Sequence, residues 1–270
     1  MLVDSFGRKI TYLRISLTDM CNYRCVYCMP AEGVELKPYD EILRYEEIEK
    51  IVRQAAELGI TKIRLTGGEP LVKKDLVYLV GLLAAIPGLE EINMTTNGSL
   101  LTPEMARNLK GAGLSRINIS LDTLDKGKFS QITRGGNLDD VMNGISAARA
   151  AGFDPIKINM VIFEDTTAEE IEELRSFCTG HGLVLQTIKQ FSLYDTKDPA
   201  GAETADRPPK CASCNRLRIT SDGYIKPCLF SGDEIKIDLD DIRGSLLRAV
   251  EQKPETGRSC KNRLMCQIGG

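Results

Sequence analysis

Three cysteines lie close together near the start of the chain, at Cys21, Cys25 and Cys28. Thiolates bind iron–sulfur clusters, and a four-iron cluster is ordinarily held by four cysteines. The next cysteine, Cys178, is far along the chain. A cluster held by this group would therefore have one iron open to a small molecule. The spacing predicts a catalytic centre rather than a simple electron store.

A zinc site and a buried apolar cluster are the alternatives for this first cysteine group. A structural zinc ion takes four ligands in a closed tetrahedron, typically from paired Cys-x-x-Cys units. A buried apolar cluster would not need polar spacers such as Asn22, Tyr23 and Arg24. The residues therefore favour an iron–sulfur centre.

A second group consists of Cys211, Cys214 and Cys228. Short strands are expected at 216–220 and 224–226, joined by a turn that would return Cys228 to the side of Cys214. The pattern favours a second cluster over zinc.

Three further cysteines lie outside these two groups. Zinc remains an alternative at the second group because Cys260 or Cys266 could supply a fourth ligand. Cys178 has the apolar spacing of a helix core around it and is expected to be buried there.

The elements that must position these groups alternate between strands and helices from Thr11 to about Phe191. Apolar runs predict strands, and apolar residues at helical spacing predict helices between them. Helix start signals are Thr102, Asn137 and Thr167. The expected strands span residues 12–17, 62–65, 91–95, 116–120, 156–162 and 184–191.

This alternation predicts a parallel sheet with helices on its outer face. The expected fold class is α/β, a partial (β/α)6 TIM-like barrel over residues 1–192. A linker at 193–210 and a small cysteine-rich module at 211–270 are expected to follow. Active sites in such sheets gather at the carboxyl ends of the strands, where most of the candidate residues fall.

The composition bears on partners and location. Net charge is −3 over 270 residues, so no global basic field for nucleic acid or a membrane is expected, and an anionic substrate would need a local cluster of cations. No signal peptide and no membrane-spanning run is visible. Nine cysteines in a chain of this length indicate metal ligation in a reducing cytoplasm rather than disulfides.

The motifs carry a family resemblance. The Cys-x-x-x-Cys-x-Tyr-Cys motif with Gly67-Gly68-Glu69-Pro70 resembles the radical S-adenosylmethionine (SAM) superfamily. Within it, nearly the whole chain resembles the GTP 3′,8-cyclase family (molybdenum cofactor biosynthesis protein A), of which it would be a shortened member. The matching segments are residues 4–8, 12–19, 63–71, 95–98, 119–122, 211–218, 227–230 and 268–270.

The resemblance implies a fold, cofactors and roles. The barrel would be of the radical SAM type, and the C-terminal module would hold an auxiliary cluster. Cys21, Cys25 and Cys28 would be the catalytic ligands of a [4Fe–4S] cluster that binds SAM. The SAM-binding residues would be Tyr27, Gly67, Gly68, Glu69, Ser120 and Phe191, the last in place of a methionine.

The resemblance also implies a substrate site. Cys211, Cys214 and Cys228 would hold a second [4Fe–4S] cluster, whose open iron contacts guanine in the family. The GTP-binding residues would be Arg14, Arg64, Thr95, Lys157, Arg216, Arg218, Gly269 and Gly270.

Three of these positions have an independent physical interpretation. Arg14, Arg64 and Lys157 each interrupt an otherwise apolar strand. A charge in a buried strand costs free energy unless it is paired or faces a ligand. One such cation could be an ordinary ion-pair partner, whereas three on different strands of one barrel favour a triphosphate.

The expected reaction is reductive cleavage of SAM, hydrogen-atom abstraction from C3′ of GTP and cyclisation onto C8 of guanine, the first step of molybdopterin synthesis. The alternatives are another radical SAM enzyme acting on a peptide or other metabolite, and a non-catalytic scaffold with two zinc sites. An electron donor such as a flavodoxin or ferredoxin is implied, and a homodimer is an open alternative to a monomer.

Overall fold

The computed structural model describes residues 1–35, 37–194 and 211–269. Nine strands form one sheet in the order β11-β10-β9-β3-β4-β5-β6-β7-β8 among these residues. The six strands that follow chain order, β3 to β8, are parallel. They are β3 (Tyr12–Ser16), β4 (Lys62–Thr66), β5 (Glu91–Thr96), β6 (Arg116–Ser120), β7 (Lys157–Ile162) and β8 (Val184–Lys189).

The predicted strands are confirmed, with ends that agree or differ by at most two residues. The largest difference is at β8, which ends at Lys189 rather than at residue 191. Its neighbour β7 ends at Ile162, the residue in register with Lys189, and the last backbone hydrogen bond of the pair runs from the N–H of Gln190 to the carbonyl of Ile162 at 2.9 Å.

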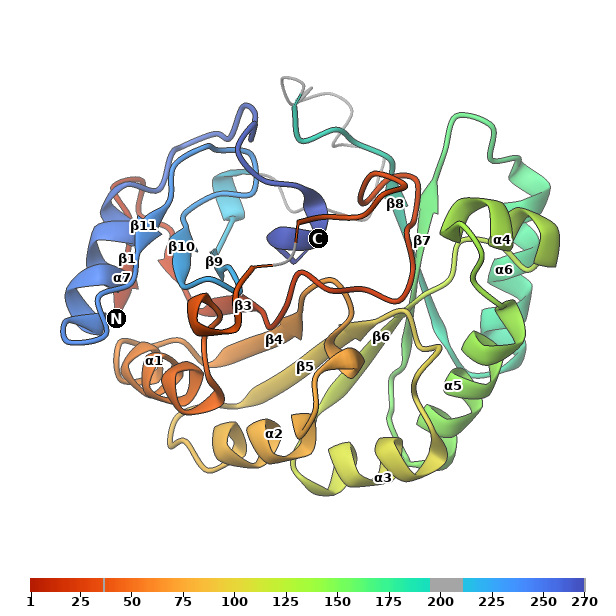
Figure 1. Ribbon diagram of the computed structural model, residues 1–270, viewed down its shortest axis with the longest axis horizontal. Helices are drawn as coiled ribbons and strands as arrows, with labels where there is room; N and C mark the ends of the chain where they lie inside the picture. The colour runs from red at the N-terminus through yellow and green to blue at the C-terminus, as the bar shows by residue number, and fades with distance from the viewer. Residues whose placement is uncertain (36, 195–210, 270) are drawn as a thin grey trace.

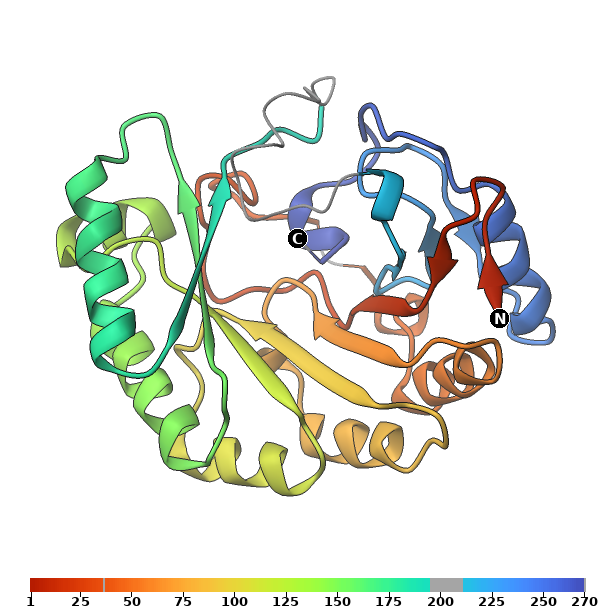
Figure 2. The same ribbon diagram turned by 180° about the vertical axis from the view of Figure 1, so that it is seen from behind.

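Helices cover the outer face of the sheet, which curves around the C-terminal segment (Figures 1 and 2). The predicted caps are confirmed, because the side chains of Thr102, Asn137 and Thr167 all accept a hydrogen bond from the first turn. The helices are α1 (Tyr45–Glu57), α2 (Leu76–Ala84), α3 (Pro103–Gly111), α4 (Lys126–Thr133), α5 (Leu138–Ala150), α6 (Ala168–Gly180) and α7 (Ile242–Glu251).

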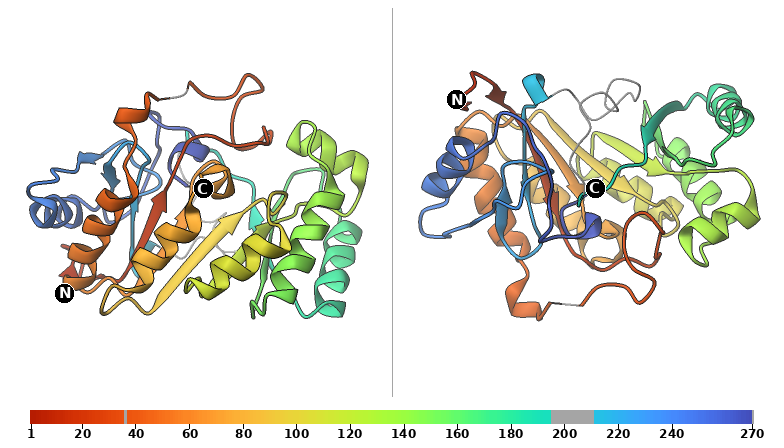
Figure 3. Two further views of the ribbon diagram at one scale, coloured as in Figure 1. Left: turned by 60° about the horizontal axis from the view of Figure 1, so that its bottom comes forward. Right: turned by 90° about the horizontal axis from the view of Figure 1, so that it is seen from above.

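Alternation along the strands separates an apolar outer face from a polar inner face. Leu13 and Ile15 of β3 belong to the main core, whereas Arg14 between them faces the inner side, where it lines a cavity. Figure 3 shows the same division: α1 to α6 lie on one side of the sheet, and the C-terminal segment lies on the other.

The chain after the undescribed segment continues the same sheet. β9 (Arg216–Ile219) pairs in parallel with β3, and β10 (Tyr224–Lys226) forms the predicted hairpin with β9. β11 (Ile235–Lys236) extends it, while β1 (Leu2–Val3) and β2 (Lys9–Ile10) form a separate two-stranded sheet.

The division into a barrel, a linker and a small module stays a prediction, and positions 195–210 of the predicted linker lie outside the described residues. Within the described part of the chain, no helix has the length and apolar character needed to cross a membrane.

Candidate active site

The loop after β3 carries the first cysteine group. Cys21, Cys25 and Cys28 are free thiols, each partly buried. The N–H of Cys28 donates to the carbonyl of Cys25 at 3.0 Å, and the sulfur of Cys21 accepts from the N–H of Tyr23 at 3.4 Å. All three thiols line one cavity of about 190 Å³. Three free thiols around one cavity are a donor set that fits an iron–sulfur cluster.

Gly67 and Gly68, directly after β4, hold this loop against the sheet. The N–H of Gly68 donates to the carbonyl of Thr18 at 2.7 Å, and the N–H of Glu69 donates to that of Met20 at 2.8 Å. A Cβ on Gly68 would lie 2.2 Å from the carbonyl oxygen of Met20, and one on Gly67 2.6 Å from that of Thr18. Both glycines are thus needed for the fit to the cysteine loop, and their approach to SAM stays a prediction.

The carboxyl group of Glu69 is buried and hydrogen-bonded through both oxygens. Its Oε1 accepts from the hydroxyl of Thr96 at 2.6 Å and from the N–H of Leu71 at 3.0 Å, and its Oε2 accepts from the N–H of Asn97 at 2.7 Å. Burial raises the pKa of Glu69 to about 7. Glu69 thus ties the end of β4 to the end of β5, where the amide of Asn97 reaches the sulfur of Cys21 at 3.9 Å.

A second buried carboxyl group, Asp122, follows β6. One oxygen accepts from the hydroxyl of Tyr27 at 3.1 Å and the other from the N–H of Val161 at 2.8 Å. Burial raises the pKa of Asp122 to about 6. Burial, followed by the charge of Asp122, raises the pKa of Tyr27. Asp122 therefore fixes the aromatic residue of the cysteine motif.

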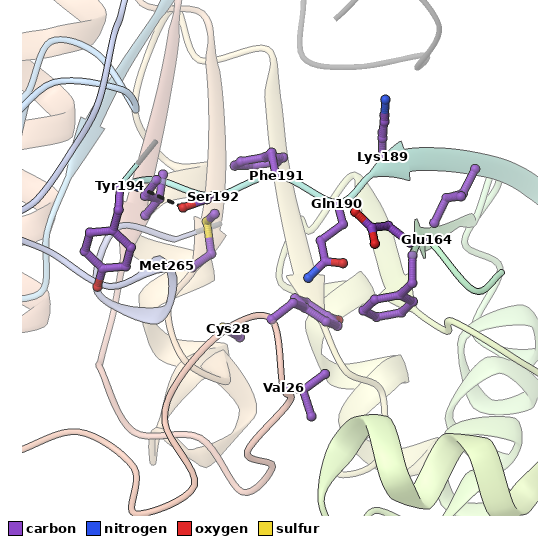
Figure 4. Close-up of a pocket in the computed structure, with 13 residues that line it drawn as sticks. Val26, Cys28, Glu164, Lys189, Gln190, Phe191, Ser192, Tyr194 and Met265 are labelled. Carbon is purple, nitrogen blue, oxygen red and sulfur yellow. Dashed lines mark hydrogen bonds between the residues drawn. The ribbon is translucent and has the colours of Figure 1, made fainter. Parts of the chain in front are cut away.

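The cavity beside the thiols is also lined by the predicted SAM residues Tyr27, Gly67, Gly68, Glu69, Ser120 and Phe191. A neighbouring cavity of about 610 Å³ shares part of this lining, namely Tyr27, Cys28, Lys189, Gln190, Phe191 and Met265. Figure 4 shows this larger space, with Cys28 of the cysteine loop near Met265 of the C-terminal segment.

Four arginines line a third cavity, of about 80 Å³. Arg14 on β3 is in register with Arg64 on β4 and with Arg218 on β9, so three guanidinium-bearing residues lie in one row across the sheet. Each of the three is at most 8% exposed. Arg216 lies on the same strand face as Arg218, and its guanidinium group is 5.5 Å from the centre of the Tyr12 ring.

The arginines are buried beside one another. Burial, followed by the charge of Arg218, holds the pKa of Arg14 well below its ordinary range. Burial, followed by the charge of Arg216, lowers the pKa of Arg218 to about 10. Buried like charges cost free energy that a bound anion would offset. The arginine row (Arg218, Arg14 and Arg64) with Arg216 is therefore a candidate anion site.

The arginine cavity and the thiol cavity adjoin, because four residues line both: Thr95, Asn159, Ile188 and Phe191. Thr95, one of the predicted substrate residues, accepts a hydrogen bond from Arg64 at 3.0 Å. The predicted SAM and GTP residues thus meet at a shared wall.

The second cysteine group lies at the base of the β9–β10 hairpin. Cys211 lies in the short helix η3 (Cys211–Ser213), and Cys228 follows β10. Burial is the largest cause that raises the pKa of Cys228. The charges of the neighbouring Cys214 and Cys211 raise it further. The pKa of Cys214 is lowered, because Lys253 and the N–H of Arg216 together outweigh the opposing effect of burial. The hairpin therefore brings the three thiols near one another in a cationic surrounding.

The two remaining C-terminal cysteines lie in different places. Cys260 packs in a small buried cluster with Phe230 and Ile268. Cys266, in the short helix η4 (Met265–Gln267), is buried near the first cysteine group instead, where the interaction of the two thiols raises the pKa of Cys28 and lowers that of Cys266. Nothing in the sequence near Cys266 indicates this proximity.

The end of the chain reaches the inner face of the sheet. Arg218 donates to the carbonyls of Ile268 at 3.2 Å and Gly269 at 2.9 Å. A Cβ on Gly269 would lie 2.5 Å from the hydroxyl oxygen of Thr66, so the chain is in close contact with β4 there. Gly270 lies outside the described residues. Lys157, by contrast, is the first residue of β7 and lines none of the three cavities above.

Several residues of the site were not singled out from the sequence. Asn159 interrupts an apolar strand as Lys157 does, so the same signal could have identified it. Asn97 and Asp122 occur in the matched motifs without an assigned role. Gln190 and Met265, which line the two larger cavities, carry no local signal at all.

Among the residues that the structure describes, no three His, Cys, Asp or Glu side chains converge as the ligands of a single metal ion do. The thiolates of a four-iron cluster bind separate irons and stand further apart, so neither cysteine group is at odds with such a cluster.

The comparisons with known proteins give two kinds of similarity. The model of the radical SAM superfamily matches residues 15–178. Curated relatives named GTP 3′,8-cyclase include one from Peptoclostridium acidaminophilum, 41% identical over 322 residues, with 100% of this chain and 98% of that protein covered. Another, from Petrotoga mobilis, is 39% identical over 324 residues, with 100% of each chain covered. These alignments exceed the 270 residues of this chain, so it is a shortened relative.

Among solved structures, SuiB of Streptococcus suis, crystallised with S-adenosylmethionine, superimposes with a TM-score of 0.70 at 18% identity. The similarity covers 91% of this chain and 64% of that one, and it concerns the fold. Membership of this family implies a [4Fe–4S] cluster, SAM and a small-molecule substrate. The chain therefore belongs to the radical SAM superfamily and, within it, to the family of GTP 3′,8-cyclases.

Proposed function

We propose that this chain converts GTP to its 3′,8-cyclised form, by abstraction of the C3′ hydrogen atom and addition of C3′ to C8 of guanine. The observation that carries the proposal is the shared wall between the thiol cavity and the arginine cavity. A cluster and SAM, when bound at the first, supply a one-electron cleavage that yields the hydrogen-abstracting radical. The arginines of the second hold the substrate beside it.

The two cavities suit ligands of opposite charge. SAM carries a sulfonium and an ammonium group, and the thiol cavity has the buried carboxyl groups of Glu69 and, behind Tyr27, Asp122. The triphosphate of GTP is an anion, and guanidinium groups bind phosphate oxygens through paired hydrogen bonds. The arginine row would fulfil this role, and its place along one cavity supports the assignment.

Residue roles follow from these positions. Tyr27, Gly67, Gly68, Ser120 and Phe191 would enclose SAM. The substrate contacts would come from Arg14, Arg64, Thr95, Arg216, Arg218 and Gly269. Lys157 and Gly270 stay proposed contacts on the family resemblance alone.

We also propose a second [4Fe–4S] cluster at Cys211, Cys214 and Cys228. The cationic surrounding from Lys253 supports it, because the thiolate form of a cysteine is the metal ligand. A flavodoxin or ferredoxin would supply two electrons, one for the cleavage of SAM and one that, together with a proton, reduces the nucleotide radical left after C3′ has bonded to C8. None of the nine cysteines, all of which lie within the described residues, is in a disulfide bond, and we propose a cytoplasmic location, where thiols stay reduced.

The proposal is tested by incubating the anaerobically reconstituted, reduced chain with SAM and GTP and analysing the products by mass spectrometry. We expect deoxyadenosine and a cyclised nucleotide. With Arg216→Ala we expect deoxyadenosine without the nucleotide product, because the substrate is no longer held. Arg149→Ala, an exposed position on α5, is the matched control and should behave like the parent chain.

Three results would decide against the proposal or part of it. Deoxyadenosine with no change in GTP would favour the alternative, a radical SAM enzyme acting on a peptide or another metabolite. Full product formation by Arg216→Ala would remove that residue from the substrate site. If metal analysis finds about eight irons per chain, it supports two clusters. Two zinc ions and no iron would instead indicate the non-catalytic scaffold with two zinc sites.

A further inference from the structure

The helix that follows β6, α4, ends against the cysteine loop. The N–H of Arg24 donates to the carbonyl of Thr133 at 3.1 Å. The N–H of Val26 donates to the carbonyl of Ile132 at 2.9 Å. The last carbonyls of a helix have no partner within the helix. Here the cysteine loop supplies the partners, although it lies far from α4 in the sequence.

Arg134, the residue directly after α4, reaches the same loop with its side chain. Its Nη1 atom donates to the carbonyl of Arg24 and to the carbonyl of Met29, each at 2.9 Å. These two carbonyls flank the segment that carries Cys25 and Cys28. The guanidinium group of Arg134 therefore joins the two ends of the part of the loop that holds two of the three thiols.

The backbone of Arg134 has a conformation that favours glycine. Its φ is 54° and its ψ is 58°, which is the left-handed region. Glycine is the usual residue at this place after a helix, because it has no Cβ. Among the described residues other than glycine, Asp75 is the one further position with a positive φ, of 56°. The hydrogen bonds of the Arg134 side chain offset a conformational cost that glycine would not have.

Gly136, two residues further on, also packs against the loop. A Cβ there would lie 2.9 Å from the Cζ atom of the Tyr23 ring and 2.6 Å from the hydroxyl oxygen of Thr133. Tyr23 is buried, and its ring lies edge-on to that of Phe129 with 6.1 Å between the ring centres. The turn after α4 thus contacts the cysteine loop through its carbonyls, through a close glycine and through the Arg134 side chain.

We propose that Arg134 is a positioning residue for the N-terminal cluster, because it holds the segment with Cys25 and Cys28 in the shape that binds iron. It acts through the backbone of the loop and lines none of the three cavities of the site. This inference rests on the proposed function for the assignment of these cysteines as cluster ligands. It adds a turn outside the cavities to the machinery that supports SAM cleavage.

The first test is amide hydrogen exchange of the metal-free full chain, measured by mass spectrometry on peptides that span the cysteine loop. In Arg134→Gly we expect the amides of Arg24 and Val26 to exchange about tenfold faster, the effect of one lost hydrogen bond to a charged group. Exchange of the sheet strands should stay at the parent rate. In Arg134→Lys the loop should exchange at an intermediate rate, because the ammonium group also donates.

Asp75→Gly is the matched control. Asp75 is exposed at the start of α2, and glycine enters a left-handed backbone there as it does at position 134. Any effect of glycine on the backbone is therefore common to both variants, whereas the contact with the cysteine loop is lost only in Arg134→Gly. The loop of Asp75→Gly should exchange at the parent rate.

The second test uses the anaerobically reconstituted, reduced chain. The electron paramagnetic resonance signal that changes on addition of SAM identifies the N-terminal cluster, and a chelator of ferrous iron is then added. We expect this signal to disappear about tenfold faster in Arg134→Gly than in Asp75→Gly, with Arg134→Lys between the two.

Four results would overturn the inference. Equal exchange of the loop in Arg134→Gly and Asp75→Gly would show that the side chain does not hold the loop. Faster exchange throughout Arg134→Gly would show a general loss of stability instead. Equal rates of signal loss in the two variants would show that the shape of the loop does not retain the iron. A parent chain with no SAM-responsive signal would overturn the cluster assignment itself, and the exchange experiment, which needs no metal, separates that failure from the others.

Discussion

The two cysteine groups differ in their electrostatic surroundings. The N-terminal group lies beside the buried carboxyl groups of Glu69 and Asp122, and burial followed by the charge of Asp122 raises the pKa of Cys25 to about 12. The C-terminal group lies beside Lys253, whose ammonium group donates to two backbone carbonyls at 2.8 and 2.6 Å and lowers the pKa of Cys214.

This difference indicates how one barrel can bind two ligands at adjoining sites, each ligand at the site whose charge is opposite to its own. A cationic ligand is favoured beside the carboxyl groups, and an anionic ligand is favoured beside the arginines and Lys253. Three substitutions test this difference: one changes the loop at the acidic side, one the basic side, and one the acidic group itself.

The largest effect is expected from Gly68→Ala. The added Cβ would lie 2.2 Å from the carbonyl oxygen and 2.5 Å from the carbonyl carbon of Met20, which are backbone atoms, so the cysteine loop must move. We expect iron content to fall by about half, as one cluster of two is lost, and deoxyadenosine release to cease. Iron analysis and product analysis measure both.

The control for that variant is Gly81→Ala on α2, where a Cβ would meet nothing within 4 Å. Replacing a helical glycine by alanine there should stabilise the chain by up to about 1 kcal/mol. Full iron loading of Gly68→Ala would show that the cysteine loop does not depend on its contact with Gly68.

A smaller but still large effect is expected from Arg14→Met at the basic side. Removing one buried charge from the arginine row should weaken GTP binding by about 100-fold, since truncating a buried charge pair costs roughly 2–5 kcal/mol. Without nucleotide, the free energy of unfolding should stay equal or rise, because the like charges of Arg64 and Arg218 lose a buried neighbour. Calorimetry and urea unfolding measure the two quantities.

Arg149→Met is the control for this variant, because Arg149 is exposed on α5. SAM binding should be unchanged in both. An equal loss of SAM and GTP affinity in Arg14→Met would mean that the two sites are not separated by charge.

The third effect, which concerns stability rather than ligand binding, is a pH dependence at Glu69. Its pKa is raised by burial from 4.5 to about 7, so the folded chain binds a proton that the unfolded chain releases across this window. The free energy of unfolding should therefore fall as pH rises from about 4.5 to about 7, by roughly 3 kcal/mol. Glu69→Gln should reduce this fall. Urea unfolding of the reduced, cluster-free chain at several pH values measures it.

The exposed Glu104 on α3 provides the comparison, since Glu104→Gln should leave the parent pH profile unchanged. If Glu69→Gln kept the full pH dependence, the ionisation of Glu69 would not be coupled to folding.

The sequence by itself determined the strands, the helix caps and the N-terminal cysteine group. These features are local: a strand shows its alternation within a few residues, and the three cysteines lie on one short loop. The β9–β10 hairpin is also local, and it was predicted correctly. Residue patterns and caps within a few positions predict such elements, so their signals can be read in the linear chain.

Only the tertiary structure decided which distant residues meet. The parallel pairing of β9 with β3 aligns Arg218 with Arg14 and creates the arginine row. The C-terminal segment brings Met265 to the cavity that Cys28 lines, and the hydrogen bond from Tyr27 to Asp122 also joins residues that are far apart in the sequence. Parallel pairing and terminal docking depend on the packing of the whole barrel, so no short stretch of sequence carries their signal.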